Sequence, residues 1–150
     1  MPKYTGHIKL DGVFCRRAEF EQVTIPAGHL GPPPARLDDD LSLVLSVKWW
    51  EREDELVDVE LGVKLNPEIE KQPYLVDVSI VGRFGFGDLP EGLSEDEFIR
   101  RNAAAILMPF AREVIGNLTM RGTFGPIWLP PVNVIGMLDR VEEERGIQAK

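Results

Sequence analysis

Side chains that could catalyse a reaction or bind a metal are few and widely separated in this chain. The two histidines, His7 and His29, and the single cysteine, Cys15, do not have the spacing of metal ligands. The run Asp38–Asp40 offers three carboxylates but lacks a further acid at the spacing of a calcium-binding loop. The sequence therefore predicts no metal site.

Sequence motifs of enzymes are also missing. There is no Gly-x-Ser-x-Gly elbow, phosphate-binding loop or Cys/His pair. Gly82–Gly87 is rich in glycine but lacks the order of a dinucleotide-binding turn, so we expect a mobile or tightly turned connection after a strand. The adjacent Arg112 and Glu113 are typical of a salt-bridged pair at a subunit contact. We therefore expect no enzyme, no catalytic residue and no cofactor.

Composition limits the classes of protein that remain. A chain of 150 residues, 43% hydrophobic and 28% charged, predicts one globular domain over residues 1–150. The net charge of −8 argues against nucleic acid and anionic membrane surfaces as partners. The longest apolar run, Ala103–Ala111, is too short for membrane insertion. The first residues lack the apolar core of a signal peptide and one cysteine cannot form an internal disulfide, so we expect a cytoplasmic protein.

The elements that must position any binding residue are four strands followed by two helices. Alternating apolar and polar residues predict strands at His7–Val23, Leu41–Trp50, Val57–Leu65 and Tyr74–Val81. Asp11-Gly12 marks a bulge in the first strand. Short connections favour antiparallel pairing, whereas Pro26–Asp40, with three consecutive prolines, predicts a stiff crossover.

The helices follow the strands. Ser94, with Glu97 three residues later, predicts the start of a long helix that continues to about Met120 and is kinked at Pro109. Asn133 is expected to cap a second, shorter helix. The predicted fold class is α+β: a four-stranded antiparallel β-meander sheet followed by a long and a short α-helix.

The loop between the helices is unusually apolar. It spans Thr123–Pro131 and carries Phe124, Ile127, Trp128 and Leu129. Burying each of these side chains is worth roughly 1.5–3 kcal/mol, so the loop must be covered by its own core, a sister subunit or a client chain. The second strand also carries an apolar side chain that must be covered. Trp49 and Trp50 point to opposite faces of this strand, so one lies in the core and Trp50 needs a cover on the other face.

The same stretch resembles the SecB family of bacterial export chaperones. The similar residues are Ile106-Leu107-x-Pro109-x-Ala111-Arg112-Glu113-x-Ile115, then Arg121-Gly122-Thr123-Phe124, then Leu129-x-Pro131-Val132-Asn133. The strand pattern of Ile8–Glu21 and the run Leu75–Val78, followed by Gly82 and Phe84, are also similar to the family.

This resemblance implies a function and a set of sites. SecB proteins are cytosolic, ATP-independent holdases that keep preproteins unfolded, pass them to the translocase motor SecA and assemble as a dimer of dimers. It implies client binding by the crossover Pro26–Leu37 and by the apolar loop. With Trp50 added, the client-binding candidates are Leu30, Trp50, Phe124, Ile127, Trp128 and Leu129.

Two further sets of residues follow from the resemblance. Glu21, Leu75 and Asp77 match the SecA-binding pattern, although Arg17 stands where the family has another acid. The oligomer interface is expected to include Val76, Val78 and Ile80 from the fourth strand and Ile106, Phe110 and Val114 from the long helix.

Three other interpretations remain open. A specialised SecB-like chaperone could serve a toxin–antitoxin system. An apolar small-molecule carrier would use Trp128 and Phe124 to line a closed pocket. A purely structural oligomer would bury the loop permanently.

Overall fold

The computed structural model describes residues 8–23, 42–66, 74–87, 94–129 and 133–138. Its strands are β1 (Ile8–Gln22), β2 (Ser42–Glu51), β3 (Val57–Asn66) and β4 (Tyr74–Phe86). The long helical segment comprises α2 (Glu95–Phe98), the π-helical turn η1 (Ile99–Ala103) and α3 (Ala104–Thr119). The proposed crossover with Leu30, the acidic run Asp38–Asp40 and both histidines lie outside the described residues.

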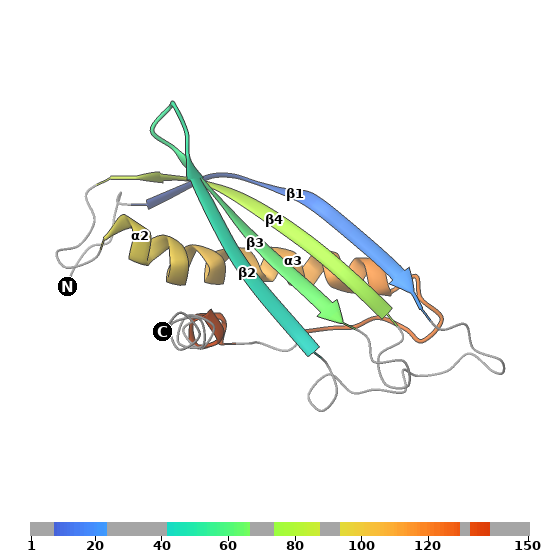
Figure 1. Cartoon of the computed structure of the whole chain (residues 1–150). Helices are drawn as coiled ribbons and strands as arrows, with labels where there is room; N and C mark the ends of the chain where they lie inside the picture. Colours follow the sequence, from blue (N-terminus) through green and yellow to red (C-terminus); the bar gives the residue numbers. More distant parts are fainter. Residues whose placement is uncertain (1–7, 24–41, 67–73, 88–93, 130–132, 139–150) are drawn as a thin grey trace, which may run out of the picture.

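The four strands form one antiparallel sheet in the order β1-β4-β3-β2 (Figure 1). Strands β2, β3 and β4 pair in sequence as a meander, and β1 pairs with β4. The consecutive strands β1 and β2 therefore lie at opposite edges of the sheet. This arrangement confirms the predicted α+β fold class.

Strand β4 is longer than predicted. The interpretation of the glycine-rich segment as a mobile or tightly turned connection is wrong for residues 82–86, which continue β4 and pair with β1. Gly82 lies between Val13 and Val59 in the sheet, and Phe84 lies opposite Val57. Glycine is needed at position 82 because a side chain there would collide with the buried Leu107 and Phe84.

Strand β1 contains two bulges. The register shift between Leu10 and Gly12 confirms the predicted bulge. A second shift, between Cys15 and Arg17, was not predicted. A regular strand would turn Arg16 and Arg17 to opposite faces, but the bulge lets Arg16 reach Glu60 on β3 and Arg17 reach Asp77 on β4.

Helix α3 covers one face of the sheet, which we call the inner face (Figure 1). Alternate residues of β3 and β4 are buried against it, together with α3 residues such as Leu107, Ala111 and Ile115. The Ser94 hydroxyl accepts a hydrogen bond from the Glu97 amide at 3.2 Å, which confirms the predicted start of the helix. The π-helical turn is a departure from the uniform helix that was expected.

The residues after the apolar loop form part of a second helix. Residues 134–138 are helical, and the Asn133 side chain accepts a hydrogen bond from the Gly136 amide at 3.0 Å, as the sequence predicts. Val134 is buried and lies beside α3, where it lines a shallow hollow with Met108. Among the described helices, none is long and apolar enough to cross a membrane.

Candidate functional site

The apolar loop begins where α3 ends. The amide of Gly122 donates to the Thr119 carbonyl at 3.0 Å, and the amide of Gly125 donates to the Gly122 carbonyl at 3.2 Å. Gly125 has a φ of 87°, a left-handed conformation that favours glycine. These contacts reverse the chain and return it along the side of α3.

Three polar side chains from different elements bind the loop backbone. Thr119, on α3, accepts a hydrogen bond from the Ile127 amide at 2.8 Å and donates to the Ile115 carbonyl at 2.7 Å. Gln22, on β1, accepts from the Thr123 amide at 2.9 Å and donates to the Thr123 hydroxyl at 2.6 Å. These bonds satisfy loop amides that would otherwise lose their partners on burial, so the loop has a defined path.

Tyr74, on β4, is the third anchor. Its hydroxyl accepts a hydrogen bond from the Phe124 amide at 2.8 Å, and the end of its ring lies against Gly122. The ring also packs against Phe20 and Phe124, with centroid separations of 5.2 and 6.2 Å. Burial raises the pKa of Tyr74, so the phenol stays neutral at physiological pH.

The four apolar side chains of the loop differ in exposure. Leu129 is 4% exposed and belongs to the core. Phe124 and Ile127 are half-buried and pack against the core. Trp128 is 53% exposed, and its ring lies over Gly116 of α3. The loop therefore presents Trp128, flanked by two half-buried apolar side chains.

Trp50 lies far from this group, on the opposite, outer face of the sheet. It is 40% exposed and lies directly across from Asp58, whereas Trp49 packs against the core. Asp58 is buried, and hydrogen bonds from Arg83 hold the pKa of its carboxyl below the usual value. The structure does not bring Trp50 and Trp128 together.

The SecA-binding candidates also lie on the outer face. Glu21 and Leu75 are directly opposite each other in β1 and β4. Asp77 lies two residues further along β4, where Arg17 contacts its carboxylate at 3.3 Å. The structure therefore groups these three residues and places a cation beside one of them.

The oligomer-interface candidates divide into buried and exposed residues. Val76, Val78 and Ile80 are at most 2% exposed within the single chain, beneath α3. Ile106 and Phe110, on the side of α3, are 39% and 38% exposed. Phe110 and Val114 also border a hollow of about 260 Å³ beside β1.

Residues that could support chemistry are not brought together. Among the described residues, no group of three His, Cys, Asp or Glu side chains could hold a metal. Neither Arg112 nor Glu113 forms an ion pair within the part of the chain that the structure describes. The expected salt bridge at a subunit contact stays a prediction.

The sequence did not identify the residues that anchor the loop. Gln22 and Thr123 are 101 positions apart, so no local pattern connects them. Gly116 could have been recognised from the sequence. Glycine inside a helix lowers helix stability by about 1 kcal/mol relative to alanine, so its presence there indicates that another group packs closely against it. Here the neighbour packed against it is the ring of Trp128.

Comparisons with known proteins agree on one family. A family model described as preprotein translocase subunit SecB matches residues 3–145. The protein-export protein SecB of Caulobacter sp. (strain K31) is 30% identical over 141 residues, covering 91% of this chain and 80% of that protein. The SecB of Dechloromonas aromatica is 35% identical over 99 residues, which cover 65% of this chain and 64% of that relative.

A solved structure of a SecB-like chaperone shares the fold. The SecB-like chaperone Rv1957 of Mycobacterium tuberculosis, in complex with a ChAD peptide from the Rv1956 HigA1 antitoxin, superposes with a TM-score of 0.60. The match covers 84% of this chain and 90% of that chain at 15% sequence identity.

The anchoring of the loop by Thr119 predicts a local effect of Thr119→Val. This change keeps the shape of the side chain but removes the acceptor for the Ile127 amide, which should cost about 1–3 kcal/mol and open the loop. Hydrogen exchange at Ile127 should become fast, while exchange in β3 and β4 stays slow. Thr119→Ser is the control, since it keeps the hydroxyl. Equal protection of Ile127 in both variants would contradict this role of Thr119.

Proposed function

The chain belongs to the SecB family, and on that premise we propose that it is an ATP-independent holdase for non-native polypeptides. In this proposal the apolar loop at the end of α3 binds clients, keeps them unfolded and releases them without a catalysed reaction. The protein would act in the cytoplasm on unfolded preproteins.

The exposure of Trp128 on a loop with a fixed backbone carries the proposal. The loop amides donate hydrogen bonds to Thr119, Tyr74 and Gln22, so the loop backbone is ordered before a client binds. Client binding therefore does not have to overcome the entropy cost of ordering this loop. Trp128 is left 53% exposed beside Ile127, and such an aromatic surface binds apolar segments with little sequence specificity. Repeated weak contacts along an extended client would add up by avidity.

This geometry favours a holdase over a small-molecule carrier. A small-molecule carrier needs an enclosed pocket, whereas Trp128 lies on the surface of the chain. A structural oligomer would need Trp128 covered in the assembled protein. The direct experiment mixes the protein with a chemically unfolded client and measures suppression of aggregation without ATP.

Trp128→Ser separates client binding from stability. Because Trp128 is half-exposed, the change should cost only about 1 kcal/mol of stability, against about 3 kcal/mol or more for a buried tryptophan. Affinity for an unfolded client, measured by titration, should fall about fivefold or more. Leu10→Ser, which alters an exposed apolar side chain near the other end of β1, is the matched control. A large loss of stability with unchanged client affinity would favour the structural oligomer.

We also propose self-assembly as a dimer of dimers through α3. Ile106 and Phe110 are exposed on α3. Phe14, on β1, is 47% exposed and lines the hollow that Phe110 and Val114 border. An apolar surface of this kind is typical of an interface. Val76, Val78 and Ile80 would then stabilise the protomer beneath the helix that makes the contact.

Light scattering tests the assembly. The mass at micromolar concentration should be about four times the 16.9 kDa of the chain. Phe110→Asp should reduce it by placing a charge in the contact, whereas Met120→Asp, at the exposed end of α3, should leave it unchanged. A wild-type mass near that of a monomer would refute the interface.

The handover of clients to SecA is a separate part of the proposal. Glu21, Leu75 and Asp77 would form the docking surface on the outer face. Two residues of this surface, Glu21 and Asp77, are acidic. Arg17 contacts Asp77 at 3.3 Å and neutralises its charge, which weakens docking of a basic partner. This ion pair is the observation that favours the second candidate function, a specialised SecB-like chaperone of a toxin–antitoxin system.

Two variants distinguish export from specialised service. Asp77→Lys should weaken SecA binding without changing client affinity, and Arg17→Ala should strengthen it, because rim charges mainly set the association rate and its salt dependence. Binding can be measured by interferometry at low and at physiological salt. If neither the wild type nor Arg17→Ala binds SecA at low salt, the specialised function replaces the export function.

A further inference from the structure

The outer face of the sheet contains a trench that the client-binding proposal leaves unused and that shares Arg17 and Asp77 with the surface proposed for SecA. Ser46, Gly62 and Ser79 lie side by side on β2, β3 and β4, and Arg17 lies opposite Ser79 on β1. This row of small residues forms a low floor across the sheet. Larger side chains stand on both sides of it and enclose a hollow of about 530 Å³.

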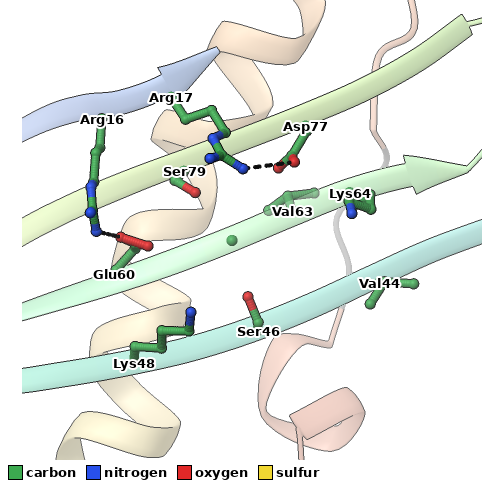
Figure 2. A pocket seen from close by; sticks show the side chains of 11 residues that line it. Arg16, Arg17, Val44, Ser46, Lys48, Glu60, Val63, Lys64, Asp77 and Ser79 are labelled. Carbon is green, nitrogen blue, oxygen red and sulfur yellow. Dashed lines mark hydrogen bonds and ion pairs between the residues drawn. The ribbon is translucent and has the colours of Figure 1, made fainter. Parts of the chain in front are cut away.

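The rows beside the floor carry charge. Lys48 and Glu60 are paired on one side, and Lys64 and Asp77 on the other. Figure 2 shows Arg16 and Arg17 extending from β1 to Glu60 and Asp77, with α3 behind the sheet. The lining therefore includes four cations, Arg16, Arg17, Lys48 and Lys64, and two carboxylates.

The cations dominate the accessible surface of the trench. In the pair of Arg16 and Glu60, joined at 2.7 Å, the side chains are 60% and 12% exposed. In the pair of Arg17 and Asp77 they are 56% and 19% exposed. The carboxylates thus lie lower and the guanidinium groups lie above them. Lys48 and Lys64 are exposed and form no ion pair with the described residues.

We propose that this trench, lined by Arg16, Arg17, Lys48 and Lys64 over the floor of Ser46, Gly62 and Ser79, binds an acidic, extended segment of a partner protein. Three strand spacings of about 4.8 Å make the trench about 14 Å long. An extended chain advances about 3.3 Å per residue, so about four residues fit. The lysines and arginines would contact carboxylates, and the serine hydroxyls can donate hydrogen bonds to them.

Charge complementarity supports an acidic peptide although the whole chain carries −8. At physiological ionic strength, charges are screened beyond about 8 Å, so the trench acts through its own lining. The low floor leaves room for the backbone of a bound peptide, whereas a surface of tall side chains would contact only the ends of the peptide's side chains. The site does not depend on Trp128, and it shares only Arg17 and Asp77 with the surface proposed for SecA.

The probe for this site is a fluorescent peptide of alternating glutamate and serine, titrated against the full chain by anisotropy. Binding should be saturable and should weaken as salt is raised. Lys48→Gln and Lys64→Gln should each weaken it about two- to fivefold, the effect of one exposed ion pair. Lys9→Gln, an equal loss of charge on β1 outside the trench, should leave the affinity unchanged.

A further variant tests the shape of the site without changing its charge. Ser79→Leu fills the floor and should abolish peptide binding, while suppression of client aggregation by the same protein should be retained. Lys48→Gln should likewise leave SecA binding and holdase activity intact, because Lys48 lies opposite Glu60 and away from Asp77. Failure of this inference is therefore distinguishable from failure of the proposed function.

Four results would overturn the proposal. The first is equal affinity for the peptide with glutamine in place of glutamate. The second is equal weakening by Lys9→Gln, which would indicate non-specific attraction. The third is tighter binding of a DNA strand of the same charge, which would identify a different occupant. The fourth is a fall in oligomer mass on Lys64→Gln, which would assign the trench to a second copy of this chain.

Discussion

Close packing of α3 against the inner face of the sheet determines how the other surfaces are arranged. Gly82 on β4 leaves the space that Leu107 and Phe84 fill, and small residues such as Ala104 and Ala111 let the helix approach the strands. A helix packed on a single sheet buries only the side that faces the strands. Ile106 and Phe110 consequently remain on the side of α3 that the strands do not cover.

The position of the apolar loop follows from the same packing. Because α3 ends beside Tyr74 and Gln22, the loop amides find acceptors on β4 and β1 as well as on Thr119. The polar groups of the loop are used to fix its backbone, and the tryptophan ring lies over Gly116 with half its surface exposed. A loop with a fixed path and an exposed aromatic side chain needs no chemical reaction to hold an unfolded chain.

The two faces of the sheet then differ in chemistry. The inner face is a hydrophobic core, whereas the outer face carries Arg16 and Arg17 above the carboxylates of Glu60 and Asp77. The second bulge in β1 is responsible for this concentration of positive charge, because it directs consecutive arginines to the same side. The proposed client-binding loop and the proposed partner site thereby lie on separate surfaces of one small domain.

The sequence by itself determined the family, the four strands, the caps at Ser94 and Asn133 and the bulge at Asp11-Gly12. These are local: alternation, capping and turn chemistry depend on residues a few positions apart. Residues 82–86 were misinterpreted for the same reason, since a glycine-rich run resembles a turn until β1 and β3 are seen to pair with it. Only the tertiary structure decided which loop residues stay exposed, how Gln22 meets Thr123, and where the trench of Ser46, Gly62 and Ser79 lies. Each of these depends on strand order and register, which are set by contacts between residues far apart in the chain.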